Sequence, residues 1–424
     1  MKPFFSVQRI LVSSQILFGL ASWLFMFLIP DIAQKQNKDK EQVWIRVYMD
    51  GIFVLPLCIW IKIKTGLTNS KGFTCALILE GASLLLMGFG QYEKNTSPLL
   101  YCLIYRVFNG CGWVFATYHG LAQIITKKPK KIDQIFSQFS ASFILGTILA
   151  PFLGYLTCNL NYFLLFSLAG LIVLAYSVAY NFILSDSTEQ DLELKVSIST
   201  LLRKKPFIFS LFIQSAPFIS IAFVFTSTLS YLDSLLSFPD MALECIFLSY
   251  KIPFFLSCII TPILLKSNSF IQKHFLTGGY LLSGIGFLLL LEQVNIKNPI
   301  VISGSLAALG TSSGFILSNF YVVPPLSKLL RCLQIHFNSI YSPAAVSEVL
   351  FFCTVLAYFC KFLGVILGGL ALKYSFYSIP YLVFSCFFII LSLLSKYDQT
   401  FEIISDTTLI ELIDVKAENL EIIK

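Results

Sequence analysis

Five charged side chains lie in stretches of this 424-residue chain that are otherwise mostly apolar: Asp50, Glu80, Arg106, Lys251 and Lys361. A charge in hydrocarbon costs at least about 2.5–3.5 kcal/mol even on the mildest scale. Each of these groups therefore requires an ionic partner or a water-filled cavity. Side chains placed in this way bind ionic substrates, carry protons or form buried ion pairs, so they are the first candidates for chemistry.

Lys361 is the strongest candidate for a binding site, because it lies nearest the middle of its apolar stretch and its amine cannot easily reach water. Asp50 and Arg106 each lie about ten ångströms from one end of their stretches, so their depths permit an ion pair. That pair would either fasten two helices together or handle substrate and protons. Glu80 is the candidate proton carrier, because ionising a carboxyl in hydrocarbon is costly; packing is its alternative role.

Two further residues have open assignments. Lys251 either extends its amine toward water at one end of its helix or faces a cavity. His119 lies in "YRVFNGCGWVFATYHG", residues 105–120, where an imidazole could titrate in the working pH range or could simply be hydrogen-bonded. The three histidines are far apart and no metal-ligand cluster or nucleophile constellation is present, so we expect neither an enzyme nor a bound metal or cofactor.

The composition places the chain in a membrane. Hydrophobic residues make up 56% of the sequence and charged residues 12%, and the mean hydropathy is +0.79. These are too few charges to coat a soluble globule of this size. The net charge of +7 gathers in loops on one side of the predicted spans, which indicates membrane topology and no nucleic-acid partner.

Apolar windows long enough to cross the bilayer divide the chain into regular units. The hydrocarbon core is roughly 30 Å thick and needs about 20 mostly apolar residues per helix. The sequence therefore predicts an all-α integral membrane protein with twelve transmembrane helices. Their windows are residues 10–30, 43–63, 72–90, 99–125, 136–157, 162–184, 206–231, 244–265, 276–293, 298–322, 346–372 and 375–395.

A polar stretch of mixed charge, beginning "SDSTEQ" at Ser185, separates the sixth window from the seventh. We expect a first six-helix half over residues 1–184, a cytosolic linker over 185–205, a second half over 206–395 and a cytosolic tail over 396–424. Most lysines and arginines of the loops fall on the side of the two termini. The positive-inside rule therefore predicts that both termini are cytosolic.

A repeated pattern of small residues relates the two halves. "GTILAPFLGY", which begins at Gly146, aligns with "CKFLGVILGG", which begins at Cys360. The alignment places Ala150 with Gly364 and Gly154 with Gly368. Small residues four positions apart let helices approach closely in lipid. Parallel six-helix repeats of this kind build transporters with a central binding site.

Two of these segments resemble motifs of one family. "RVFNGCG", from Arg106 through Gly110 to Gly112, resembles the fourth-helix motif of the major facilitator superfamily. "GTILAPFLGY", with Pro151 at its centre, is similar to the fifth-helix motif of that family's proton-coupled antiporters. The tenth-helix region "GSLAALGTSSGFILSNFYVVPPLSKLL" and the eleventh-helix region around "FCKFLGVILGGLAL" resemble the vesicular amine and polyamine transporters of solute carrier family 18.

The resemblance implies the major facilitator fold, with two pseudo-symmetric halves, and secondary transport by alternating access. It further implies proton-coupled antiport of amines or polyamines by a monomer in a vesicle membrane, another endomembrane or the plasma membrane. The lipid bilayer, protons and a small organic ion would be its partners.

Departures from the family pattern leave two alternatives open. The gating stretch "TGLTNSKG" lacks an acidic residue, and Lys361 stands in a helix where amine carriers place a carboxylate. The transported ion could instead be an organic anion or zwitterion. The chain could also be a relative that no longer transports and acts as a membrane receptor or scaffold.

Overall fold

The computed structural model describes residues 2–24, 51–65, 69–90, 98–127, 132–157, 162–184, 215–228, 232, 240–267, 269–291, 298–319, 343–374 and 378–394. These residues form twelve helical segments with no strand among them. The predicted linker 185–205 and tail 396–424 lie outside the described residues, as does Asp50.

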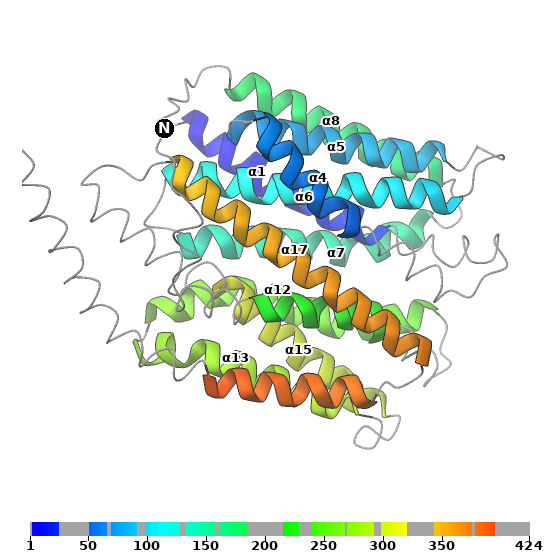
Figure 1. Ribbon diagram of the computed structural model, residues 1–424, viewed down its shortest axis with the longest axis vertical. Coiled ribbons are helices and arrows are strands. Elements are labelled where there is room, and N and C mark those ends of the chain that lie inside the picture. The colour runs from blue at the N-terminus through cyan, green and yellow to red at the C-terminus, as the bar shows by residue number, and fades with distance from the viewer. Residues whose placement is uncertain are drawn as a thin grey trace, which may run out of the picture.

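Six of the described helices precede residue 185, and they gather in the upper part of Figure 1. They are α1 (Lys2–Leu24), α4 (Gly51–Thr65), α5 (Asn69–Phe89), α6 (Pro98–Lys127), α7 (Ile132–Thr157) and α8 (Tyr162–Leu184). Within this amino-terminal group, α5 packs against both α6 and α8, and α1 packs against α7.

The second group begins with a helix over Ser215–Thr228, here called helix 215–228, whose last five residues form the π-helical turn η3 (Val224–Thr228). It continues with α12 (Asp240–Ser267), α13 (Ser269–Leu289), α15 (Pro299–Asn319), α17 (Pro343–Tyr374) and a last helix over Ser378–Leu394, helix 378–394. Here α15 packs against both α12 and α13. The green-to-red helices of this group fill the lower part of Figure 1, while α17 crosses diagonally beside α4.

Hydropathy explains why the bundle suits a membrane. Six of the described helices are long and apolar enough to cross a bilayer, and they contain the segments Ser70–Phe89, Ser137–Gly154, Phe163–Phe182, Cys245–Leu264, Pro299–Leu317 and Leu350–Ala371. Large apolar side chains point outward from the bundle; Phe182 is 75% exposed and Ile300 is 81% exposed. Backbone groups are satisfied inside each helix, as hydrocarbon requires.

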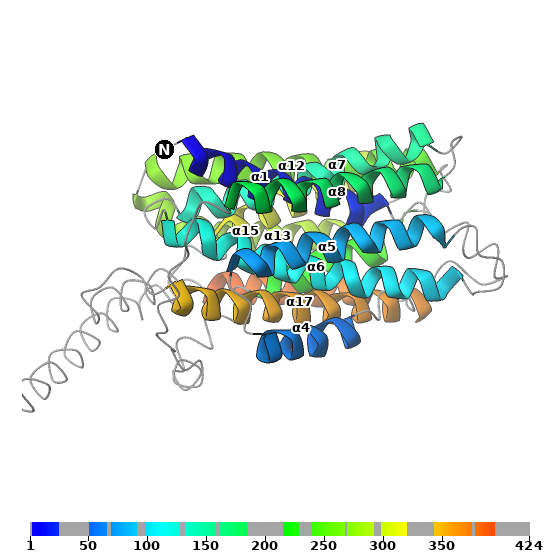
Figure 2. The same cartoon turned by 90° about the horizontal axis from the view of Figure 1, so that it is seen from above.

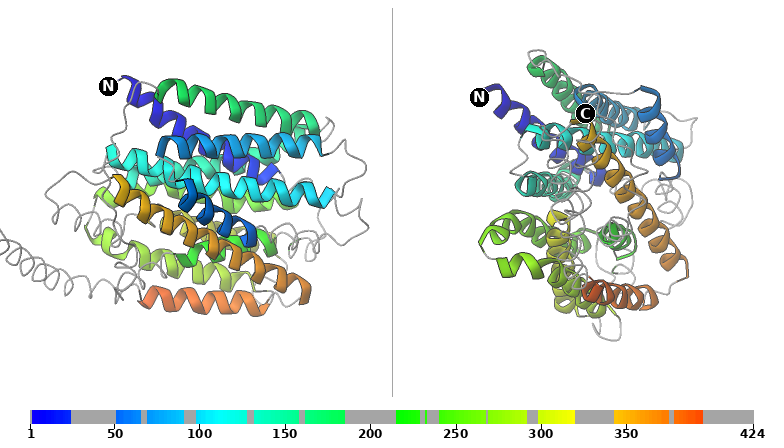
Figure 3. Two further views of the ribbon diagram at one scale, coloured as in Figure 1. Left: turned by 45° about the horizontal axis from the view of Figure 1, so that its top comes forward. Right: turned by 60° about the vertical axis from the view of Figure 1, so that its left-hand side comes forward.

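Successive helices run in alternating directions, which defines two ends of the bundle. We call the end where α1 begins the amino-terminal face and the end where α1 finishes the opposite face. The midpoints of α6 and α17, near Trp113 and Lys361, lie halfway between these faces. Figure 3 shows the bundle from two further directions, with α17 along one side.

The small-residue segments lie where two helices approach each other closely in each half. A Cβ atom on Gly146 of α7 would lie 2.1 Å from the backbone oxygen of Ile16 in α1. A Cβ atom on Gly364 of α17 would lie 2.1 Å from the backbone oxygen of Ile219 in helix 215–228. The pairs α1 with α7 and helix 215–228 with α17 are therefore packed in the same way, because backbone atoms cannot give way as a side chain can.

The two halves meet along two pairs of helices. On one side α7 contacts α12 and α15, and on the other α17 contacts α6 and α4, as Figure 2 shows from above. Gly110 of α6 permits part of this contact, since a Cβ atom there would lie 2.5 Å from the hydroxyl oxygen of Tyr358 in α17. Gly112, two residues on, faces inward toward α5 and α1, where the nearest atoms belong to Ala76, Glu80 and Phe18.

Candidate functional site

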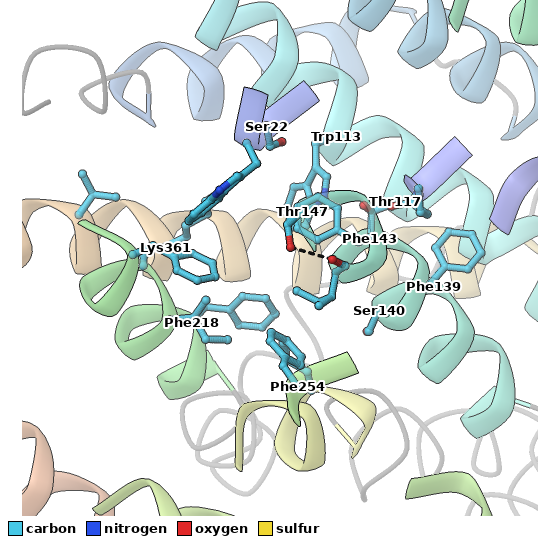
Figure 4. Close-up of a pocket in the computed structure, with 18 of the residues that line it drawn as sticks. Ser22, Trp113, Thr117, Phe139, Ser140, Phe143, Thr147, Phe218, Phe254 and Lys361 are labelled. Atoms are coloured by element: carbon cyan, nitrogen blue, oxygen red, sulfur yellow. Dashed lines mark hydrogen bonds between the residues drawn. The ribbon is translucent and has the colours of Figure 1, made fainter. Parts of the chain in front are cut away.

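A cavity of about 140 Å³ lies between the two halves. Helices α1, α6 and α7 line it from the amino-terminal half, and helix 215–228, α12, α15 and α17 line it from the other half. Figure 4 shows Lys361 and Phe218 at one side and Ser140 and Phe139 at the other, with Trp113 between them. A volume of this size is comparable to one that holds a benzene molecule.

Among the described residues, two charged ones line the cavity, and both are cations: Arg106 of α6 and Lys361 of α17. Arg106 is buried, and Lys361 is half-buried near the midpoint of its helix. The Nζ atom of Lys361 lies 5.6 Å from the ring centroid of Trp113 and 5.5 Å from that of Tyr358. These distances fall within the range of a cation–π contact, which here joins the two halves at their middle.

Six uncharged polar side chains also line the cavity: Gln15, Ser22, Thr117, Ser140, Thr147 and Thr226. Some of them are satisfied within their own helices; the hydroxyl of Thr147 donates a hydrogen bond to the backbone oxygen of Ile144 at 2.8 Å (Figure 4). Others are not. The buried Nε2 of Gln15 and Oγ1 of Thr117 have no hydrogen-bond partner, and neither has the indole Nε1 of Trp23, which lines the same cavity. Buried polar atoms without a hydrogen-bond partner are rare in folded proteins and require an explanation.

Aromatic side chains form most of the remaining wall: Trp23, Trp113, Phe139, Phe143, Phe218, Phe225 and Phe254. Trp113 packs edge-on against Phe143 with their ring centroids 6.3 Å apart. Phe225 packs in the same way against Trp23 at 5.0 Å. The cavity is therefore an apolar chamber with a small number of polar groups, which is the usual make-up of a small-molecule site.

Glu80 does not line the cavity but lies behind it. Its side chain is fully buried in α5, and its Oε1 accepts a 2.7 Å hydrogen bond from Nδ2 of Asn109 in α6. Its Oε2 has no hydrogen-bond partner. Arg106 is close enough to interact electrostatically with the carboxyl group. Arg106 thus contacts the cavity on one side and senses the charge of Glu80 on the other.

The structure places Lys251 and His119 outside the cavity wall. Lys251 is fully buried near the midpoint of α12, with its Nζ atom 3.6 Å above the ring centroid of Trp23. It therefore neither extends into water nor lines the chamber. His119 is also buried, with its ring 3.7 Å from that of Tyr118 and packed against Gly72 of α5, where a Cβ atom would overlap the imidazole.

A second contact between the halves lies toward the amino-terminal face. The Nζ atom of Lys62 in α4 donates a 3.1 Å hydrogen bond to the hydroxyl of Tyr118 in α6. The same amine lies 5.6 Å from the ring centroid of Phe351 in α17. Tyr118 and Phe351 pack edge to face at 5.1 Å. Aromatic rings and a lysine thus join the halves at this end, as they do where Lys361 meets Trp113 and Lys251 meets Trp23.

Sequence reasoning singled out Arg106 and Lys361 but missed the polar residues around them. Arg106, Gly110, Trp113 and Thr117 recur at the spacing of one helical face, and this spacing indicates that they point in a common direction. Gln15 and Trp23 are eight residues apart on α1 and share a face for the same reason. No group of His, Cys, Asp and Glu in the described residues could hold a metal ion.

Comparison with known proteins identifies the fold. Residues 11–327 match the family model of the Major Facilitator Superfamily. The structure is similar to that of "the MFS (major facilitator superfamily) proton:xylose symporter XylE bound to 6-bromo-6-deoxy-D-glucose", with a TM-score of 0.68 and 12% identity over 92% of this chain and 94% of that one. A comparison with curated proteins finds no match.

These findings confirm the predicted fold class, an all-α, multi-pass membrane protein with the major facilitator fold. The family and its fold are those of membrane transporters and not of enzymes, as the sequence predicted.

Proposed function

Because the chain belongs to the Major Facilitator Superfamily, we propose that it carries a small organic ion across the membrane by alternating access, coupled to protons. The observation that carries the proposal is the cavity between the halves, with Arg106 on one half and Lys361 on the other. When two halves rock about a site that both of them line, the site opens to one face at a time.

In this proposal Lys361 and Arg106 contact the substrate, and Glu80 holds the proton. Glu80 is suited to this role because it is buried and has one carboxylate oxygen with no partner, while Asn109 fixes the other. A proton on Glu80 changes the charge beside Arg106 and so changes the cavity wall. Arg106 would therefore couple the proton to the substrate without direct contact between them.

The sense of coupling and the charge of the substrate are finer proposals. Exchange of substrate for protons is supported by the α7 segment with Gly146, Pro151 and Gly154, which is similar to the antiporter motif. An amine or polyamine substrate is supported by the resemblance to solute carrier family 18 and by aromatic rings that could stack a cation. An organic anion is supported by the two cations of the cavity wall.

We further propose that both termini face the cytosol, because the loops on their side carry most of the lysines and arginines. The protein would act as a monomer in a vesicle membrane, another endomembrane or the plasma membrane.

Uptake into proteoliposomes tests the proposal. The purified chain is reconstituted with an imposed proton gradient and offered radiolabelled polyamines, monoamines and organic anions. We expect gradient-dependent uptake of one class, abolished by Lys361→Ala and retained in Lys64→Ala, which removes an exposed lysine of α4. Uptake by Glu80→Gln should no longer respond to the gradient, because glutamine keeps the oxygen that accepts from Asn109 but cannot bind the proton.

The opposite result has a clear meaning. If folded protein takes up none of these compounds, the chain is a relative that does not transport, and the missing acid in "TGLTNSKG" is then the feature that explains it. If uptake occurs but Glu80→Gln remains coupled to the gradient, the proton is held elsewhere.

A further inference from the structure

We infer that the cavity binds a small organic anion with an apolar body, an inference that rests on the proposed function in taking this cavity as the transport site. The first support is the charge of the wall. Within the described residues that line the chamber, Arg106 and Lys361 are charged and none is acidic. A cationic ligand placed between two cations would meet like charges, which would weaken its binding.

The second support comes from the three polar side chains that lack partners. Gln15, Trp23 and Thr117 are 2%, 4% and 8% exposed, and each has a buried polar atom with no hydrogen-bond partner. The indole N–H of Trp23 can only donate, and so can the amide nitrogen of Gln15. These groups require acceptor oxygens. A carboxylate or sulfonate supplies such oxygens, whereas an ammonium group supplies only donors.

The third support is the shape and lining of the rest of the chamber. Its volume of about 140 Å³ leaves room for a body of roughly one aromatic ring. Phe143, Phe218 and Phe254 line it with apolar surface that would cover such a body. Such a ligand would place its charged head near Arg106 and Lys361 and its apolar body against the phenylalanines. It would then be complementary to both the charged and the apolar residues of the cavity.

The test uses three ligands that share one ring and differ in a single group: benzoate, benzyl alcohol and benzylamine. Binding of each to the purified full chain is measured by calorimetry at neutral pH. We expect benzoate to bind on the order of tenfold more tightly than benzylamine, since a hydrogen bond to a charged group contributes about 1.5–3 kcal/mol. Lys361→Met should remove about this factor for benzoate and leave the affinity for benzyl alcohol unchanged.

Two further variants make the test specific. Thr117→Val removes a hydroxyl at nearly constant volume and should weaken benzoate binding severalfold; it also serves if Lys361→Met fails to fold. Lys64→Met removes a lysine outside the cavity wall and should have no effect. Tighter binding of benzylamine than of benzoate, benzoate binding that neither cavity variant weakens, or no benzoate binding by folded protein would each overturn the inference.

The result is separable from the transport experiment. Benzoate binding by a protein that takes up none of the offered compounds would support the anion site and overturn the transport proposal. Proton-dependent uptake of an amine, together with absence of benzoate binding, would support the transport proposal and overturn the anion site.

Discussion

The amino-terminal half buries a carboxyl group, Glu80, against an amide, Asn109, whereas the carboxy-terminal half buries hydroxyl pairs such as Ser283 with Ser312. The carboxy-terminal half also contains stacked rings, such as Phe287 with Phe388. Both halves are packed by close approach of helices at glycines, so the difference is one of chemistry and not of architecture. The proposed proton carrier therefore belongs to the first half, while both halves supply cations to the interface.

Those cations make the interface itself asymmetric. Lys251 and Lys361 belong to the second half and lie over Trp23 and Trp113 of the first. In the other direction, Lys62 of the first half lies over a ring of the second. The contacts of Lys251 and Lys361 lie near the midpoints of their helices, and that of Lys62 lies toward the amino-terminal face. The halves are thus joined by cation–π contacts at the middle and toward one face.

The largest expected effect tests the shared packing. Gly146→Ala and Gly364→Ala each force a Cβ atom against backbone of the neighbouring helix, so each should lower the free energy of unfolding by about 1–3 kcal/mol. The measurement is thermal unfolding in detergent. Gly304→Ala is the control, because a Cβ atom there meets nothing within 4 Å. Destabilisation by only one of the two glycine variants would mean that the halves are not packed alike.

The next prediction concerns the buried carboxyl. Asn109→Leu removes the hydrogen bond to Glu80 and leaves its Oε1 without that donor, at a cost of about 1–3 kcal/mol. It should also alter the proton dependence of transport, since the position of the carboxyl is no longer fixed. Unfolding and the pH profile of uptake are measured together. A loss of stability with an unchanged pH profile would assign the pair to packing alone.

A third prediction separates two levels of the interface. Lys251→Met breaks the contact with Trp23 near the middle and should favour opening toward the opposite face, while Lys62→Met breaks the contact toward the amino-terminal face and should favour opening there. A desolvated cation–π contact contributes about 1–2 kcal/mol, so the ratio of the two states should shift roughly five- to thirtyfold. The measurement is labelling of a cysteine at Ser140, in a chain without other cysteines, by an impermeant maleimide added from each side.

The side from which each lysine variant increases maleimide labelling decides whether its contact holds one end of the bundle closed. If both lysine variants change labelling from the same side, or neither does, the contacts do not hold the ends closed.

The smallest effect is expected in the second half. Ser283→Ala removes one hydroxyl pair and should cost only about 0.6 kcal/mol, the average for polar contacts between membrane helices. Uptake and its proton dependence should be unchanged. A strong transport defect in this variant, with stability retained, would show that proton handling is not confined to the first half.

Much of the architecture could be predicted because it depends on short-range patterns. Apolar windows mark the helices, since a bilayer of fixed thickness leaves few other structures possible. The cavity wall was predicted only in part: Arg106 and Lys361 line it, whereas Lys251, Glu80 and His119 do not. A charge within an apolar window implies a partner, but the window does not say which helix supplies it.

The sequence by itself therefore determined the twelve-helix class, the internal repeat and the list of buried charges, because each is a property of composition and spacing along one segment. Only the tertiary structure decided that Glu80 pairs with Asn109, that Lys251 lies on Trp23 and that Gln15, Trp23 and Thr117 surround one chamber with Arg106 and Lys361. The physical reason is that a helix fixes the direction of its side chains relative to its own axis, while their neighbours depend on how seven helices from two halves come together.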